Sequence, residues 1–257
     1  MFFHHGRSWN LKGHNLLKIN VVPKNWGRAN SEHVHFLLNN VAQHFLKCFY
    51  SGFSGQIDVE CHPGRTTGQV LCRDSSGNNH IVILTTHDYC LWSYQFAHEL
   101  CHILSNYNNL HFLPNRWFHE ALCDLASIFT VRQMAASWQT IFPSNWAFFS
   151  ISIQEYAQEL VARSDFQLPK DLTFRHWFKI NEQSLRADQY QRAKNGLIAL
   201  KLLSLVEDNP GNWESIRFIP DCEGAFGQLL SEWKNKCPEP QKRFIEEISD
   251  VFGVKTF

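Results

Sequence analysis

Two histidines and a glutamate near the middle of the chain have the types and spacing of a metal site. The segment Tyr94–Leu104 contains the pattern His98-Glu99-x-x-His102. Residues four apart lie on one face of a helix, so His98 and His102 can present their ring nitrogens to a single ion. Glu99 lies one step around the helix, where it can act as a base toward a metal-activated water. This arrangement predicts metal-assisted hydrolysis.

Two acidic residues follow at helical spacing in a second apolar segment. Glu120 and Asp124 are four residues apart within Trp117–Ala126. A hydrolytic Zn²⁺ site has three protein ligands and one open position for water, and Glu120 can supply the third ligand. Asp124 can accept a hydrogen bond from the distal nitrogen of a ligating histidine, which fixes the orientation of that ring.

Other residues near the motifs leave alternatives to this ligand set. His111 or His119 could replace Glu120 as the third ligand. Cys101 and Cys123 lie within the two motifs, but at their spacing we expect them to point away from the metal and to fill core space. Without a metal, the two motif histidines would be hydrogen-bonded residues of the core.

These motifs together resemble the gluzincin metallopeptidases, the group that includes thermolysin-like and M1 aminopeptidase-like enzymes. The order His-Glu-x-x-His and then Glu-x-x-x-Asp is that of the family, and the tryptophan three residues before the second glutamate is similar to the M1 branch. The resemblance covers residues 57–130 well and the later helices in outline. It implies that Zn²⁺ is bound by His98, His102 and Glu120, that Glu99 is the general base, and that Asp124 supports a ligand.

The resemblance also implies a substrate-binding strand. Ile81–Leu84 would be the edge strand that binds substrate backbone in extended form. The chain departs from the family in two places. Only residues 103–119 separate the second histidine from the third ligand, and the Gly-Ala-Met-Glu-Asn segment of M1 aminopeptidases is missing. The corresponding region, Cys61–Arg73, contains no acid, and Asp74 follows it. Endopeptidase and aminopeptidase activity therefore both stay open.

Peptide hydrolysis also needs a group that stabilises the oxyanion. In gluzincins this group is a tyrosine or histidine from the helical domain. Tyr190 is our candidate because Tyr190–Gly196 begins a predicted helix and resembles the Tyr-x-Lys-Gly segment of the M1 branch, with a longer spacing to the glycine. Tyr156, His111 and His176 are the alternatives.

The order of the predicted strands and helices indicates an α+β fold. It would have a small N-terminal mixed sheet and a mostly helical C-terminal half. Alternating or β-branched segments predict strands at 16–22, 57–61, 69–73 and 81–84. Apolar periodicity predicts a helix from Ser31 and later helices at about 91–106, 116–136, 152–163, 188–207, 223–235 and 239–251. We expect a zincin-like catalytic subdomain over 1–136 and a helical subdomain over 137–257 that completes the active-site cleft.

Composition excludes several classes of partner. The 257 residues include 24 basic and 24 acidic side chains, so no broad field favours nucleic acid or an anionic membrane. No apolar run has the length of a signal peptide or a membrane span, and we expect a cytoplasmic protein. The 8 cysteines include no C-x-x-C pair and are expected to be free, although Cys61 and Cys72 could face each other across a hairpin.

The predicted function is zinc-dependent hydrolysis of peptide bonds in a peptide or protein substrate. The metal would acidify a water and polarise the carbonyl, and Glu99 would move the water proton to the leaving amine. The alternative is a catalytically inactive zincin-fold binding or scaffold protein with a structural zinc. Hydrolysis of a non-peptide amide or ester also stays open. The aromatic segments 138–149 and 174–178 would line an apolar cleft or belong to the core.

Overall fold

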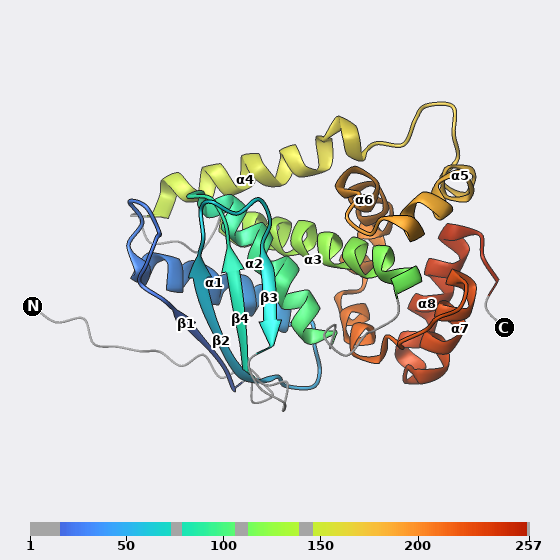
Figure 1. The fold of residues 1–257 in the computed structure, drawn as a ribbon, viewed down its shortest axis with the longest axis horizontal. Helices are drawn as coiled ribbons and strands as arrows, with labels where there is room; N and C mark the ends of the chain where they lie inside the picture. Colours follow the sequence, from blue (N-terminus) through green and yellow to red (C-terminus); the bar gives the residue numbers. More distant parts are fainter. Residues whose placement is uncertain (1–15, 73–78, 106–112, 139–145, 256–257) are drawn as a thin grey trace, which may run out of the picture.

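The computed structural model of this chain describes residues 16–72, 79–105, 113–138 and 146–255. Within these ranges a small mixed sheet precedes a mostly helical C-terminal half, so the predicted α+β architecture is confirmed (Figure 1). The strands are β1 (Leu16–Val21), β2 (Ser54–Cys61), β3 (Gln69–Cys72) and β4 (Asn79–Leu84). The α-helices are α1 (Ser31–Leu46), α2 (Tyr89–Leu104), α3 (Arg116–Ser137), α4 (Ala147–Ala162), α5 (Phe174–Ala187), α6 (Arg192–Asp208), α7 (Phe226–Lys236) and α8 (Glu239–Phe252).

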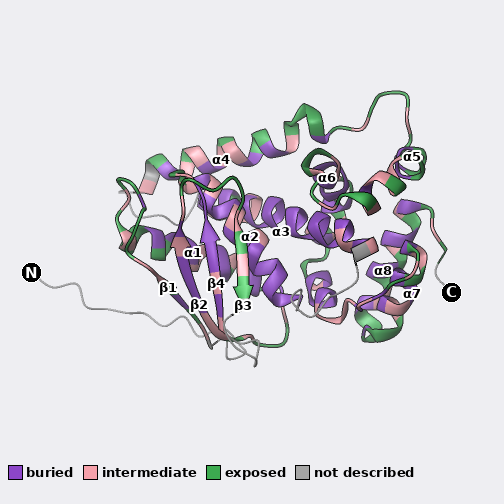
Figure 2. Cartoon of the chain, in the orientation of Figure 1, coloured by how far each residue is buried: buried purple, intermediate pink, exposed green. Residues whose placement is uncertain are grey.

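The sheet has the strand order β1-β2-β4-β3. β1, β2 and β4 are parallel, whereas β3 runs antiparallel to β4 and lies at the edge of the described sheet. The prediction that Ile81–Leu84 is the edge strand is therefore wrong, because these residues belong to β4. Val82 and Leu84 on one face and Ile83 on the other are buried, and a strand that is apolar on both faces belongs inside a sheet. Exposed residues of β3 mark the true edge (Figure 2).

The strand order also separates Cys61 from Cys72. Cys61 ends β2 and Cys72 ends β3, and β4 lies between these two strands. The hairpin partner of β3 is β4, in which Cys72 pairs with His80, so Cys61 and Cys72 are not paired across a hairpin as the sequence allowed. The thiol of Cys61 instead donates a hydrogen bond to the carbonyl oxygen of Thr86 at 3.4 Å.

The helical half differs from the prediction in three places. α4 begins at Ala147, earlier than expected, and α5 was not predicted. Thr173 caps α5 by accepting a hydrogen bond from the backbone N–H of His176, and the aromatic residues of the first turns pack into the core. α6 begins at Arg192 rather than at 188, because residues 188–191 form a turn closed by side chains.

α3 passes through the centre of the molecule and is buried over nearly its whole length (Figures 1 and 2). α2 packs along one side of α3, and α6 packs along another. A single hydrophobic cluster contains residues from both predicted subdomains. Most described aromatic residues of the two aromatic segments belong to this core, whereas Phe148 is exposed. The predicted boundary at 136/137 falls at the end of α3, and the division into two subdomains stays a prediction.

Aromatic packing anchors the start of α3 against the C-terminal helices. The ring of Trp117 lies 4.9 Å from that of Phe226 in α7, and Phe178 of α5 lies 4.7 Å from Phe252 of α8. Aromatic pairs at such distances add to the stability that burial alone provides. The first turn of α3, just before Glu120, is therefore packed against α5, α7 and α8.

Candidate metal centre

Helix α2 begins directly after β4 and is tied to the end of that strand. Asp88 caps the helix by accepting a hydrogen bond from the backbone N–H of Leu91 at 2.7 Å. The side chain of Gln95 bonds both the backbone N–H and the hydroxyl of Thr85, and the indole of Trp92 donates to the Thr85 carbonyl at 3.1 Å. These bonds set the direction of α2 and therefore the positions of the motif residues that follow.

Small residues allow α2 and α3 to approach closely. The thiol of Cys101 in α2 contacts the carbonyl of Leu122 in α3 at 3.8 Å. The hydroxyl of Ser127 in α3 donates to the carbonyl of Tyr94 in α2 at 2.9 Å. Backbone-to-side-chain contacts of this kind need short side chains between the helix axes. The close approach brings the two sequence motifs together.

The two motif histidines converge on Glu120. Nε2 of His98 lies 3.2 Å from one oxygen of Glu120, and Nε2 of His102 lies 3.7 Å from the other. Ligand atoms placed tetrahedrally about 2.0–2.1 Å from a zinc ion are about 3.3–3.4 Å apart. The distance from His98 to Glu120 is close to this value and the distance from His102 is slightly longer, each measured to a different oxygen of the carboxylate.

For Glu120 and His102, the surroundings favour the protonation state that binds a metal. Burial acts to raise the pKa of Glu120, but its hydrogen bond with His98 and the charges of both histidines lower it. Burial also holds the pKa of His102 well below its usual value. An ionised carboxylate and a neutral imidazole are the forms that bind a metal.

Asp124 lies where the sequence predicted, at the far nitrogen of His98. Nδ1 of His98 and the hydroxyl of Tyr94 both bond one oxygen of Asp124, at 3.1 and 2.9 Å. Burial acts to lower the pKa of His98, but its hydrogen bonds with Asp124 and Glu120 and the nearby carboxylate charges raise it well above its usual value. Sequence reasoning missed Tyr94, although it lies four residues before His98 on the same helix face.

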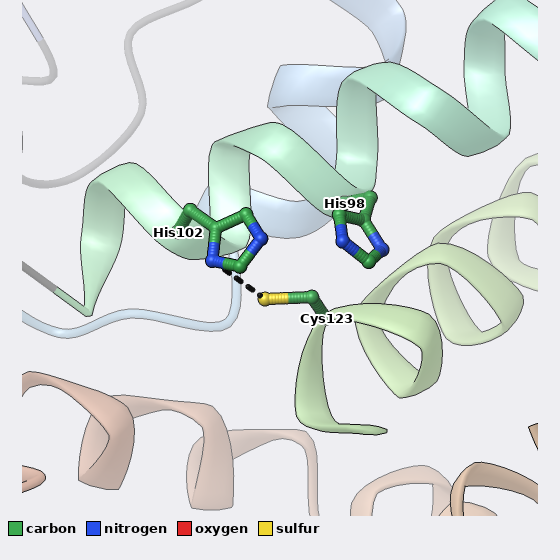
Figure 3. Close-up of side chains that lie close together, drawn as sticks. All are labelled: His98, His102 and Cys123. Carbon is green, nitrogen blue, oxygen red and sulfur yellow. Dashed lines mark hydrogen bonds between the residues drawn. The ribbon is translucent and has the colours of Figure 1, made fainter. Parts of the chain in front are cut away.

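Cys123 is a buried core residue, as predicted, but its thiol contacts one of the motif histidines, which was not expected. Its sulfur lies 3.4 Å from Nδ1 of His102, and Figure 3 shows the thiol of α3 directed at that ring. Donor atoms of His98, His102 and Cys123 all lie within 4.8 Å of one another, so this buried group could hold a metal ion. The signal was present in the sequence, because Cys123 follows Glu120 by three residues and shares its helix face. Cys101 is a small core residue, as predicted.

Of the two alternative third ligands, only His119 lies among the described residues, and it does not face Glu120. His119 turns its Nε2 to the hydroxyl of Ser105 at 2.7 Å, and its ring stacks on His102 with centroids 5.2 Å apart. This orientation places His119 behind His102 rather than beside Glu120. His111 and Asp74 lie outside the described residues.

A cleft of about 550 Å³ opens in front of the histidines. Its walls come from the edge strand region 67–70, from α2 and α3, and from the start of α6. The lining includes all five residues of the two motifs, namely His98, Glu99, His102, Glu120 and Asp124. Cys123 is not among the described residues that line it. The sequence did not single out two further lining residues, Arg192 and Asn195.

Tyr190 reaches the cleft from the turn before α6. The residue is 66% exposed, so its side chain has room to meet a bound molecule. The turn is held by Asp188, which accepts a hydrogen bond from the N–H of Tyr190 at 2.9 Å, and by Asn195, whose amide donates to the Gln189 carbonyl at 2.8 Å. The two described alternatives, on α4 and α5, do not line the cleft.

Glu99 is enclosed beneath the edge strand. Burial is the largest cause that raises its pKa, to about 7, and the charge of Glu120 adds to the rise. The charges of His98 and Arg192 and a hydrogen bond from the backbone of Val70 act in the opposite direction. A carboxylate whose pKa lies near neutrality is suited to accept and return a proton.

Comparison of the chain with protein-family models, with curated proteins and with solved structures found no match. The resemblance to gluzincins therefore rests on the motif residues of the sequence.

Proposed function

We propose that this protein is a zinc metallopeptidase of the gluzincin type, which hydrolyses peptide bonds in a peptide or protein substrate. One observation carries the proposal. Nε2 atoms of both motif histidines converge on the Glu120 carboxylate at the wall of an open cleft, with Glu99 beside them. This is the donor set of a hydrolytic zinc site, and two nitrogens and a carboxylate oxygen suit Zn²⁺.

Two donor sets share the histidines, and the geometry favours the one with Glu120. Cys123 lies against Nδ1 of His102, whereas Glu120 lies against Nε2 of the same ring, so one ion uses only one of them with His102. The nitrogens that face Glu120 belong to side chains lining the cleft. A hydrolytic metal needs an open position for water and substrate, and the set with Glu120 provides it.

When bound, the zinc lowers the pKa of a water and polarises the substrate carbonyl. Glu99 accepts the proton of the attacking water on its carboxylate and passes it to the nitrogen of the leaving amine. Tyr190 donates its hydroxyl proton in a hydrogen bond to the developing oxyanion. The enclosing backbone of Gly68–Val70 keeps bulk water from Glu99.

The edge strand supports a peptide as the substrate. β3 lies at the edge of the described sheet, where an extended peptide can add as a further strand, and its first residues line the cleft. The acids of the described lining are Glu99, Glu120 and Asp124, all of which the centre itself uses. None of these is left to hold a free amino terminus, which favours an endopeptidase. An open site with an intact base also favours catalysis over a scaffold with structural zinc.

We also propose that the protein works in the cytoplasm. The cysteines whose side chains the structure describes are all free and buried, as expected of a protein kept in a reducing compartment. Among the described helices, none is both long and apolar enough to cross a membrane.

Removal of the metal tests the proposal directly. Purified protein should cleave members of an internally quenched peptide library, lose that activity after dialysis against a chelator, and regain it when zinc is restored. Cleavage is followed by fluorescence and the cut positions by mass spectrometry. Zinc binding without any peptide cleavage would support the scaffold alternative, and cleavage that survives complete zinc removal would contradict the proposal.

Gly68→Ala tests whether the edge strand positions the base. A Cβ at Gly68 would lie 3.0 Å from a carboxylate oxygen of Glu99 and 3.3 Å from the carbonyl oxygen of Ile83, so Glu99 must shift. We expect kcat/KM for peptide cleavage to fall about 10- to 100-fold with the zinc content unchanged. Gly64→Ala is the matched control, because a Cβ there meets nothing within 4 Å. Equal activity of the two variants would show that the edge strand region does not position Glu99.

A further inference from the structure

The two histidines of the centre have different partners at their far nitrogens. Metal-binding histidines usually donate the other ring N–H to a carboxylate, a backbone carbonyl or water. His98 follows this rule with Asp124 at 3.1 Å. His102 instead faces the thiol of Cys123 at 3.4 Å, an ordinary distance for a hydrogen bond to the larger sulfur atom (Figure 3).

The protons around Cys123 can be arranged so that every donor faces an acceptor. An ion on Nε2 of His102 leaves the proton on Nδ1, which donates to the sulfur. The thiol can donate to Nδ1 of His119 at 3.9 Å, and Nε2 of His119 then donates to the hydroxyl of Ser105 at 2.7 Å. That hydroxyl donates to the carbonyl of Cys101, also at 2.7 Å. The chain of bonds ends on the backbone of the helix that carries His102.

The hydrogen bonds of Cys123, His119 and Ser105 lie in the buried interior. Cys123 is fully buried, His119 is 4% exposed and Ser105 is 2% exposed, so water has no access to replace a missing partner. Hydrogen bonds in such a dry environment hold side chains more firmly than the same bonds at the surface. The stacked ring of His119 covers one face of His102 and limits its rotation.

We propose that Cys123 is the positioning residue of His102, a thiol in the place that a carboxylate or carbonyl takes in other metal sites. The proposal rests on the metal centre with Glu120 described under the proposed function. Cys123 orients His102 and fixes its tautomer without contacting the ion.

Cobalt substitution separates this role from direct ligation. A thiolate bound to Co²⁺ gives an intense charge-transfer band in the near ultraviolet, which imidazole and carboxylate ligands do not. Apo protein loaded with Co²⁺ should show the visible bands of a four- or five-coordinate ion without the thiolate band. A thiolate band that disappears in Cys123→Ser would overturn the proposal while leaving a metal site in place. Failure of the wild type to bind Co²⁺ or Zn²⁺ would instead overturn the proposed function, and this inference with it.

Zinc affinity measures the strength of the positioning. In competition with a chromophoric chelator, Cys123→Ala should bind zinc about 10- to 100-fold more weakly than the wild type, and Cys123→Ser should recover part of the loss. Cys48→Ala is the matched control, because Cys48 is buried, its thiol donates to the carbonyl of His44 near the end of α1, and it does not line the cleft. It should lower Tm as a core truncation does without changing the zinc affinity. Wild-type zinc affinity in folded Cys123→Ser and Cys123→Ala would overturn the proposal.

Discussion

Glu99→Gln should abolish peptide cleavage while leaving the bound zinc in place. The amide has the size of the carboxylate and can still accept the hydrogen bond from Val70, so the buried site keeps its shape. It cannot accept the proton of the attacking water, and loss of a general base typically lowers kcat by about 10²- to 10⁴-fold. The measurement pairs kcat on a cleaved peptide with zinc content by elemental mass spectrometry.

The control for this variant is an equivalent change away from the cleft. Glu155→Gln alters an exposed acid on α4 and should keep wild-type kcat and zinc. If Glu99→Gln cleaves peptide at the wild-type rate, Glu99 is not the general base. A variant that loses both turnover and zinc would show that Glu99 supports the metal rather than the proton transfer.

His102→Ala should lose both the metal and the activity. The substitution removes one of three proposed ligands and empties a buried position between Glu120 and Cys123, so the remaining donors no longer surround an ion. We expect zinc to fall from about one ion per chain to a trace, with no peptide cleavage. Elemental mass spectrometry of chelator-free protein measures this ratio.

Folding must be checked alongside the metal content. His102→Gln, which fills more of the buried space, should also lose zinc, and circular dichroism should show wild-type helix content in both variants. His176→Ala removes an exposed histidine on α5 and should hold zinc as the wild type does. Full zinc occupancy in folded His102→Ala would show that His102 is not a zinc ligand and that the motif histidines are ordinary core residues.

The spacing of residues along single helices was readable because an α-helix repeats every 3.6 residues. His98 and His102 share a face of α2, and Glu120 and Asp124 share a face of α3, as their separation by four predicts. The α+β class followed from the same local periodicities. The hydrogen bond between Asp124 and His98 was also predicted, because an acid on an apolar helix needs a buried donor as its partner.

Element boundaries were less predictable where local side chains compete with the helix. Asp188 accepts the N–H of Tyr190 and Asn195 ties down the preceding carbonyl, so the chain turns before α6 instead of beginning it. As a result Tyr190 lies on a turn at the cleft rather than on a helix face. Thr173 caps α5, a signal that the sequence contained and that the prediction missed.

The sequence by itself determined which residues can share a helix face, and only the tertiary structure decided which faces and edges meet. β3 rather than β4 became the strand beside the cleft because strand order depends on pairing between distant segments. Cys123 lies against His102 because small residues let α2 and α3 approach closely. The rotation of one helix relative to the other depends on how the two pack, so the sequence of either helix alone does not predict it. Arg192 entered the cleft for the same reason, since packing of α6 against α3 brings the start of α6 to the site.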